Sequence, residues 1–218
     1  DAIRYWSGVS ADNNGVLGGY PQVSRVDLQG STQFLTKLRR KSKKFSPTTG
    51  PLPRVVDCGA GIGRLTKGFL GKVAEVVDIV EPVTQLTDVI TSGEDFAELR
   101  QKGVVGDIYN VGLEKWTPRE GREYTVIWNQ WCLGQLTDRQ LIDYFRRIKP
   151  FVAEGGWIVV KENMSTDPNG LDIFDETDSS VTRSDGKFRQ IFERAGLKMI
   201  AQELQRGMPK GLYPVRTY

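Results

Sequence analysis

The 218-residue sequence contains no histidine and only two cysteines, Cys58 and Cys132. Without histidine, the protein lacks the side chain most often used as a general base at neutral pH and the commonest metal ligand. Any proton acceptor must therefore be a carboxylate, a phenol or water, and we expect no metal site. Two cysteines are too few for a disulfide framework, so we expect both to be reduced, small core residues.

Long apolar runs are also missing. The sequence has no signal peptide and no run of about 18 apolar residues, so we expect no membrane partner and a cytoplasmic protein, with the nucleus as a second compartment. The net charge of +3 is too small by itself to imply a polyanionic partner. The length fits one domain over residues 1–218, with an N-terminal helical cap at 1–45 and a sheet core at 54–218.

The segment Arg54-Val-Val-Asp-Cys-Gly-Ala-Gly-Ile-Gly-Arg64 joins a short apolar run to three alternating glycines, and a helical pattern follows. This order predicts a strand, a tight turn and a helix. Gly59, Gly61 and Gly63 let the backbone approach a ligand, and a helix beginning at about Ile62 would direct its free N–H groups to the same place. The turn is typical of a site for a nucleotide-like ligand.

The glycine spacing helps to distinguish two such ligands. A dinucleotide fingerprint reads G-x-G-x-x-G, whereas the sixth position here is Arg64, whose bulk would obstruct close packing of strand and helix. The pattern D-x-G-x-G-x-G, which begins at Asp57, instead resembles the first motif of class I methyltransferases, which bind S-adenosylmethionine. The acid that ends the next predicted strand, Glu81, is then expected to accept hydrogen bonds from the ribose hydroxyls.

Beyond residue 54, apolar runs alternate with helical patterns, which predicts a mostly parallel sheet with helices on both faces. We expect strands at 54–58, 74–80, 103–107, 124–128, 156–161, 197–204 and 212–218, and helices at 62–71, 83–91, 94–102, 137–148 and 185–195. The fold class is therefore α/β, a Rossmann-like class I methyltransferase fold with a seven-stranded sheet. Ligands bind beyond the carboxyl ends of the strands in such folds.

The N-terminal cap holds Tyr5-Trp6, Leu17-Gly-Gly-Tyr20 and a helical pattern from Ser31 to Leu38. We expect it to cover the ligand end of the sheet, where its aromatic residues either anchor the cap in a core or line the binding site. The segment from Lys37 to Lys44 carries six positive charges in eight positions. It has no interleaved aromatics, which favours a solvated helix end over a nucleic-acid surface, and no nucleic-acid partner is required.

Two later segments carry candidate chemistry. The apolar run that begins at Tyr124 ends in two amides and an indole, where Gln130 can contact a cofactor and Trp131 is either a core residue or a substrate contact. Residues 172–180 contain four acids in what we expect to be a loop, either a solvated surface or a site for a positively charged substrate. Because a protonated amine must lose its proton before it attacks a sulfonium methyl group, one of these acids is the expected acceptor.

Several motifs together resemble the eukaryotic protein α-N-terminal methyltransferase family along nearly the whole chain. They are Tyr5-Trp6, Leu17-Gly-Gly-Tyr20, Asp57-Cys-Gly-Ala-Gly-Ile-Gly-Arg64, Ile127-Trp-Asn-Gln-Trp131, Lys161-Glu-Asn-Met164 and Asp178-Ser-Ser-Val181. Members of this family methylate the α-amine of proteins that begin X-Pro-Lys, ribosomal proteins among them. The resemblance implies S-adenosylmethionine as the methyl donor and S-adenosylhomocysteine as the product.

The resemblance also implies roles for individual residues. The implied cofactor-binding residues are Gly59, Gly61, Arg64, Glu81, Leu113, Glu114 and Gln130, with Arg64 pairing the cofactor's carboxylate. The implied substrate-binding residues are Trp6, Leu17, Val23, Trp131, Asn163, Asp175, Asp178, Ser180 and Tyr213, of which Asn163 and Asp178 are the implied catalytic residues.

Within that set, Asn163 would hold the first substrate carbonyl, and Asp175 with Ser180 would receive the lysine. Asp178 would face the α-amine as the base. Two positions depart from the family pattern, because Gln135 replaces a histidine near the amine and Gly211 replaces an acid before the late tyrosine. A glutamine cannot take a proton, which leaves the base role to Asp178, directly or through water.

Two alternatives stay open at this point. The chain could be a non-catalytic, S-adenosylmethionine-binding interaction module that uses residues 37–44 as its partner surface. It could also methylate another small cationic substrate, or RNA, although the acidic segment would repel an RNA backbone.

Overall fold

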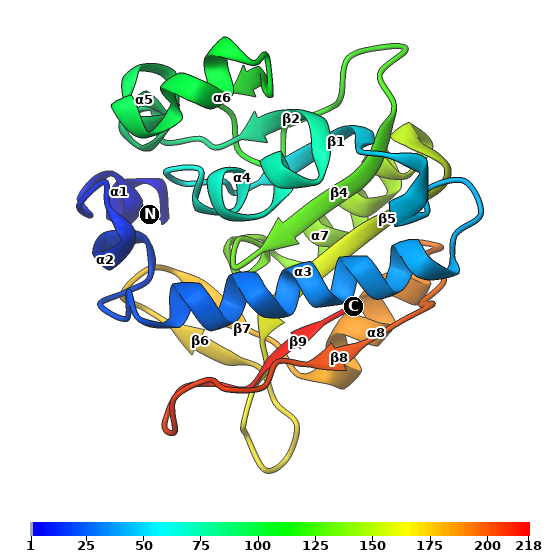
Figure 1. Cartoon of the computed structure of the whole chain (residues 1–218). Coiled ribbons are helices and arrows are strands. Elements are labelled where there is room, and N and C mark those ends of the chain that lie inside the picture. The colour runs from blue at the N-terminus through cyan, green and yellow to red at the C-terminus, as the bar shows by residue number, and fades with distance from the viewer. Residues whose placement is uncertain (1) are drawn as a thin grey trace.

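The structure is a computed structural model and describes residues 2–218. Its centre is a seven-stranded sheet in the order β3-β2-β1-β4-β5-β9-β8 (Figure 1). The strands are β1 (Leu52–Cys58), β2 (Ala74–Val80), β3 (Val105–Tyr109), β4 (Tyr124–Gln130), β5 (Val152–Asn163), β8 (Glu203–Leu204) and β9 (Val215–Thr217). The first five are parallel, and β9 and β8 continue the sheet in antiparallel pairing. The predicted α/β fold with a mostly parallel sheet is confirmed.

The helices divide between the N-terminal segment and the crossovers of the sheet. They are α1 (Ala2–Ser7), α2 (Asn13–Val16), α3 (Val23–Lys41), α4 (Arg64–Gly68), α5 (Thr84–Ser92), α6 (Ala97–Gln101), α7 (Asp138–Ile148) and α8 (Asp185–Arg194). Single 3₁₀ turns lie at η1 (Pro47–Thr49), η2 (Leu70–Lys72), η3 (Glu94–Phe96), η4 (Leu133–Gln135) and η5 (Lys149–Phe151). No helix in this described part of the chain has both the length and the apolar character needed to cross a membrane.

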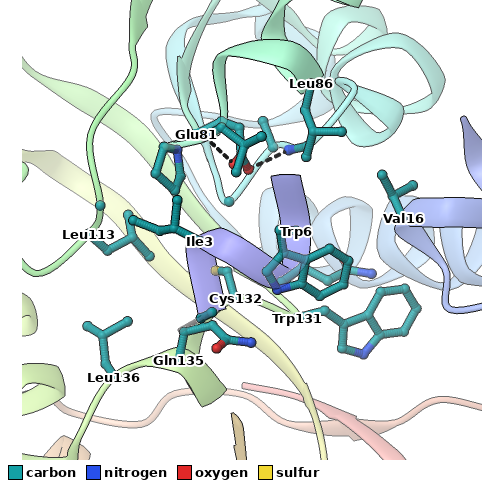
Figure 2. A pocket seen from close by; sticks show the side chains of 18 of the residues that line it. Ile3, Trp6, Val16, Glu81, Leu86, Leu113, Trp131, Cys132, Gln135 and Leu136 are labelled. Atoms are coloured by element: carbon teal, nitrogen blue, oxygen red, sulfur yellow. Dashed lines mark hydrogen bonds between the residues drawn. The ribbon is translucent and has the colours of Figure 1, made fainter. Parts of the chain in front are cut away.

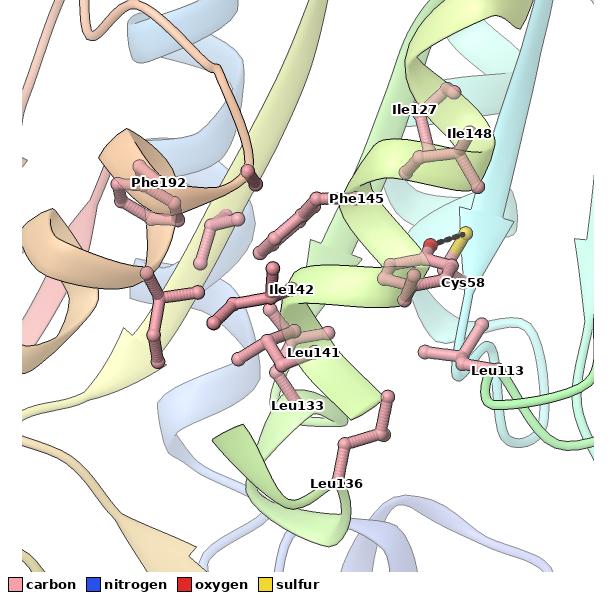
Figure 3. Close-up of a cluster of buried hydrophobic side chains, with 14 of the residues drawn as sticks. Cys58, Leu113, Ile127, Leu133, Leu136, Leu141, Ile142, Phe145, Ile148 and Phe192 are labelled. Atoms are coloured by element: carbon pink, nitrogen blue, oxygen red, sulfur yellow. Dashed lines mark hydrogen bonds between the residues drawn. The ribbon is translucent and has the colours of Figure 1, made fainter. Parts of the chain in front are cut away.

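Successive residues of the central strands point to opposite faces of the sheet and build two separate cores. Val55 and Val126 pack with α3 and α4 on one face, whereas the next residues, Val56 and Ile127, pack with α7 and α8 on the other. Figure 3 shows part of the second core, in which α7 presents its apolar side to the sheet. Strands buried on both faces explain why the sequence shows continuous apolar runs there.

The helix after the glycine turn begins later than expected and is shorter. It was predicted over 62–71, but α4 starts at Arg64 because Gly63, at φ 76°, takes the preceding position in the left-handed conformation. It ends at Gly68, and Phe69, at φ −144°, separates it from η2. The glycine that shapes the turn therefore also sets where the helix can begin.

Three other predictions in the C-terminal part of the chain were wrong in extent or type. The strand expected at 197–204 is only β8, because its partner β9 is three residues long, and Leu197 and Met199 pack against the core instead. The strand expected at 212–218 is likewise limited to β9. The acidic segment predicted as a loop contains a β-hairpin, formed by β6 (Ile173–Asp175) and β7 (Ser180–Thr182).

Candidate active site

A cavity of about 380 Å³ opens beyond the carboxyl ends of the parallel strands. Its size is in the range of small-molecule sites. The turns that follow β1, β2, β3 and β4 form its walls, and residues of α1 and α2 close it from the N-terminal side. Figure 2 shows Trp6 and Trp131 near one another on one side, with Glu81 and Leu113 placed across the cavity from them.

The glycine turn gives the cavity a wall of bare backbone. Gly59, Gly61 and Gly63 all have positive φ, at 67°, 55° and 76°. A Cβ atom on Gly59 would lie 2.3 Å from Cβ of Cys132, and one on Gly63 would lie 2.7 Å from the ring of Phe96. Only glycine fits these two positions. Gly63 packs against the core, whereas Gly59 and Gly61 line the cavity with bare backbone that a nucleoside-sized ligand can approach.

Glu81 stands at the end of β2 with its carboxylate fixed by two backbone donors. Oε2 accepts the N–H of Gly61 at 2.9 Å, and Oε1 accepts that of Val83 at 2.9 Å. Burial raises the pKa of Glu81, while these two N–H groups lower it. Each oxygen keeps a lone pair, so the carboxylate can still accept the two hydroxyls of a ribose.

Asp57, in contrast, supports the turn from behind and does not line the cavity. Its Oδ2 accepts both the backbone N–H of Thr66 at 3.1 Å and its hydroxyl at 2.7 Å, which fixes the first turn of α4. Burial raises the pKa of Asp57 to about 6. The acid of the motif therefore supports the turn and does not line the cavity.

A buried network that the sequence analysis missed lies beneath Arg64. Asp27 of α3 is fully buried and contacts the Arg64 guanidinium at 2.8 Å and Lys161 Nζ at 2.6 Å. It also accepts a hydrogen bond from Nε2 of Gln130 at 2.7 Å, and Lys161 donates to Ser31 Oγ at 2.9 Å. Arg64 is thereby held in the cavity wall with part of its guanidinium still available.

Trp131 follows β4 in a strained conformation, with φ at 51°. A left-handed backbone is costly for a bulky residue and persists only where the surroundings fix it. Its backbone N–H donates to the carbonyl of Lys161 at 3.1 Å, and its indole N–H donates to Oδ1 of Asn163 at 3.1 Å. The Arg64 guanidinium lies 5.5 Å from the ring centre, so the indole lies between Arg64 at the glycine turn and Asn163 at the end of β5.

Glu162 lies between Lys161 and Asn163 in β5 and supports the turn after Trp131. Its Oε1 accepts the backbone N–H groups of Cys132 and Leu133, both at 2.9 Å. Burial raises the pKa of Glu162 to about 7, and these hydrogen bonds oppose the increase. The thiols of Cys58 and Cys132 are free, and burial raises the pKa of both, so they are protonated packing groups.

Many of the residues predicted from the sequence meet in this cavity. Those that line it are Trp6, Leu17, Gly59, Gly61, Arg64, Glu81, Leu113, Glu114, Gln130 and Trp131. The side chain of Gln130 is largely used by the protein, because Asp27 accepts from its amide and Trp128 donates to its oxygen at 3.0 Å. One amide hydrogen stays available for a cofactor.

The other predicted residues are not among the described residues that line the cavity. They are Val23, Asn163, Asp175, Asp178, Ser180 and Tyr213. Val23 is buried at the start of α3, and Asn163 lies behind Trp131. The acids of the hairpin stabilise its turn, since Asp175 accepts the N–H of Thr177 at 2.8 Å and Asp178 accepts that of Ser180 at 3.1 Å.

The hairpin nevertheless borders the site through η4. A Cβ atom on Gly134 would lie 3.4 Å from Cβ of Ser180, so β7 packs directly on this 3₁₀ turn. The next residue, Gln135, lines the cavity, and its Oε1 is buried with no hydrogen-bond partner in the described chain. The turn η4 therefore separates the cavity from the acidic hairpin and contacts both.

The raised pKa of Glu162 leads to a prediction about stability. The folded protein holds this proton up to about pH 7, whereas an unfolded glutamate loses it near pH 4.3, so ionisation destabilises the fold increasingly between these values and fully above them. Glu162→Gln keeps an acceptor oxygen without the charge. We expect it to be more stable than the wild type at pH 8, by on the order of 1–3 kcal/mol in urea unfolding, with the difference lost near pH 4.5. A constant difference across this range would contradict the assignment.

Comparisons with known proteins identify the family of the chain. Residues 1–218 match the family described as AdoMet dependent proline di-methyltransferase. Alpha N-terminal protein methyltransferase 1 of Schizosaccharomyces pombe is 41% identical over 223 residues, which cover 100% of this chain and 93% of that protein. N-terminal Xaa-Pro-Lys N-methyltransferase 1 of Xenopus tropicalis is 36% identical, with 100% and 92% covered.

A solved methyltransferase structure has the same fold as this chain. A SAM-dependent methyltransferase of Leishmania major superposes with a TM-score of 0.84 at 32% identity, covering 100% of this chain and 80% of that one. The chain therefore belongs to the AdoMet-dependent proline di-methyltransferase family, which confirms the family that its motifs predicted.

Proposed function

We propose that this S-adenosylmethionine-dependent enzyme transfers methyl groups to the α-amine of proteins that begin X-Pro-Lys. The main structural support is the contact chain from Arg64 through Trp131 to Asn163, which runs from the glycine turn to the end of β5. Bound S-adenosylmethionine supplies an electrophilic sulfonium methyl group. The protein's task is to hold the amine in line with that group, because orientation alone can contribute several kcal/mol.

Trp131 is suited to hold the second residue of such a peptide. Its ring forms one side of the cavity and Leu17 lies in the same lining, so together they offer apolar surface for a proline ring. Proline also fixes φ near −65° and has no N–H that a closed pocket would have to satisfy. Because Asn163 uses its oxygen to accept from the Trp131 indole, its amide hydrogens are left to donate to a substrate carbonyl.

The hairpin supplies the negative charge that a lysine at the third position requires. We assign Asp175 and Ser180 to that lysine, and Asp178 to the α-amine, directly or through water. An α-amine has a pKa near 8, so only about one unit of pKa separates it from its free base at neutral pH. A modest acceptor is therefore sufficient, and a chain without histidine can carry out the reaction.

We further propose ribosomal proteins with X-Pro-Lys N-termini as partners and the cytoplasm, with the nucleus, as the location. Both proposals follow from the substrate class. Mass spectrometry of such N-termini from cells with and without the enzyme tests the first, and fluorescence microscopy of the tagged enzyme tests the second.

The placement of the cofactor predicts the effect of two substitutions. Arg64→Ala and Glu81→Ala should each weaken S-adenosylhomocysteine binding by about 1.5–3 kcal/mol, because each removes charged hydrogen bonds. Isothermal titration calorimetry gives the affinities. Lys67→Ala on the exposed side of α4, where Lys67 pairs with Asp95, is the matched control and should bind normally. Affinities within about twofold of the wild type for both site variants would contradict the placement.

A peptide panel tests the proposed substrate. Matched peptides that begin X-Pro-Lys, X-Pro-Gln and X-Ala-Lys, and an N-acetylated X-Pro-Lys peptide, are incubated with enzyme and labelled cofactor. Tandem mass spectrometry should find label only on free α-amines, with KM raised on the order of tenfold for the glutamine peptide. In Asp175→Asn this difference between lysine and glutamine should largely disappear, as expected for a direct contact. Labelling of the lysine side chain, or an equal KM for both peptides, would contradict the proposal.

The role of Asp178 has its own test. Asp178→Asn keeps the shape and an acceptor oxygen for Ser180, so it should preserve cofactor affinity and lower kcat on the order of 10²-fold or more. If Asp178 acts as a base, the variant should recover much of its rate above about pH 9, whereas an orienting role predicts a lasting deficit. Glu176→Gln in the same hairpin turn controls for lost negative charge. Full activity of Asp178→Asn at pH 7 would exclude both roles.

A further inference from the structure

Three charged side chains, those of Asp27, Lys161 and Arg64, are in direct contact at the cavity wall, and their charges do not cancel. Asp27 and Lys161 are both fully buried, and the side chain of Arg64 is 9% exposed. Asp27 contacts both cations, so one negative charge faces two positive ones. Glu162 lies on the opposite face of β5, where it binds the backbone after Trp131. The remaining nearby acid, Asp57, has a pKa of about 6 and also attracts Arg64, but it forms no ion pair with Arg64 and its Oδ2 is bound by Thr66 beneath the glycine turn.

Stability alone is a poor explanation for the buried lysine. Burying a charged pair costs desolvation energy that its attraction often does not exceed, and apolar replacements of such pairs can be neutral or stabilising. The preceding residues of β5, Val159 and Val160, show that this strand is otherwise apolar here. We therefore expect the charge of this lysine to affect a neighbouring group.

That group is Arg64, the member of the network that reaches the cavity. With Asp27 alone, the guanidinium would be paired with a carboxylate 2.8 Å away and would have little net charge to offer. Lys161, at 2.6 Å from the other oxygen, compensates that carboxylate. Asp27 can then fix the position of Arg64 without neutralising it.

We propose that Lys161 is a positioning residue for the anionic end of the cofactor: it balances the charge of Asp27, so that Arg64 keeps a net positive charge for a carboxylate. This inference rests on the proposed location of the cofactor carboxylate at Arg64. It assigns a binding effect to a side chain that does not line the cavity.

The test compares two probes by calorimetry. S-adenosylhomocysteine carries the amino acid carboxylate and amine, whereas 5′-methylthioadenosine has the same nucleoside and thioether without either group. Lys161→Met removes the lysine's charge, and Lys161→Gln also keeps a hydrogen-bond donor. Both variants should bind S-adenosylhomocysteine on the order of tenfold more weakly than the wild type, with 5′-methylthioadenosine unchanged within about twofold.

A charge-restoring variant separates electrostatics from packing. In Asp27→Asn/Lys161→Met the network again has one uncompensated positive charge, that of Arg64. Its affinity for S-adenosylhomocysteine should return to within about threefold of the wild type. Lys37→Gln, which removes a charge from the exposed side of α3 where Lys37 pairs with Glu203, controls for net charge and should bind both probes normally.

The possible outcomes distinguish this inference from the proposed function. If Arg64→Ala weakens both probes equally, the carboxylate does not lie at Arg64 and the cofactor placement itself fails. If Arg64→Ala affects only S-adenosylhomocysteine but the Lys161 variants bind it normally, the role of Lys161 is wrong. Equal loss of both probes in the Lys161 variants, or a double variant weaker than Lys161→Met, would show a structural role and overturn the inference.

Discussion

The carboxylate of Asp27 fixes helix α3 to the sheet. From α3 it reaches Gln130 at the end of β4, Lys161 in β5 and Arg64 at the start of α4. Without this carboxylate, Lys161 and Arg64 would lose their buried counter-charge and Gln130 would lose an acceptor, so the position of α3 is strongly determined. Because α1 and α2 precede α3 and line the cavity, this one contact point also determines where the cap lies over the site.

The end of β5 provides the second constraint. Three consecutive residues there serve different neighbours: Lys161 pairs with Asp27, Glu162 holds the backbone after Trp131, and Asn163 accepts from the indole. Strand geometry explains the division, since Lys161 and Asn163 point to one face and Glu162 to the other. The left-handed Trp131 is possible because these residues act on it together, and its ring thereby comes to lie between Arg64 and Asn163.

The sequence predicted those parts of the fold that are determined by residues close together in the chain. The glycine turn, the parallel strands and the acid of Glu81 could be identified because each arises from a few neighbouring residues. The Asp27 network could not, because Asp27 and Lys161 lie far apart in the chain. The hairpin β6/β7 joins near neighbours, but its strands are only three residues long and contain no buried residue, so they give no hydrophobic pattern. For the Asp27 network a signal was present, since Asp27 and Ser31 share the helix face of Phe34 and Leu38, and Lys161 follows an apolar run. Buried polar residues in such patterns indicate a partner, but only the fold identifies it.

In the proposed site, the cofactor lies at Arg64 and Glu81, and the substrate peptide lies at Trp131 and the acidic hairpin. A crystal structure with S-adenosylhomocysteine and a peptide that begins X-Pro-Lys tests this arrangement most directly. We predict the α-amine in the cavity beside Trp131 and facing the cofactor sulfur, the proline against the Trp131 ring, and the lysine directed to the hairpin. A peptide bound with its amine away from the sulfur, or bound along the basic end of α3, would contradict the account.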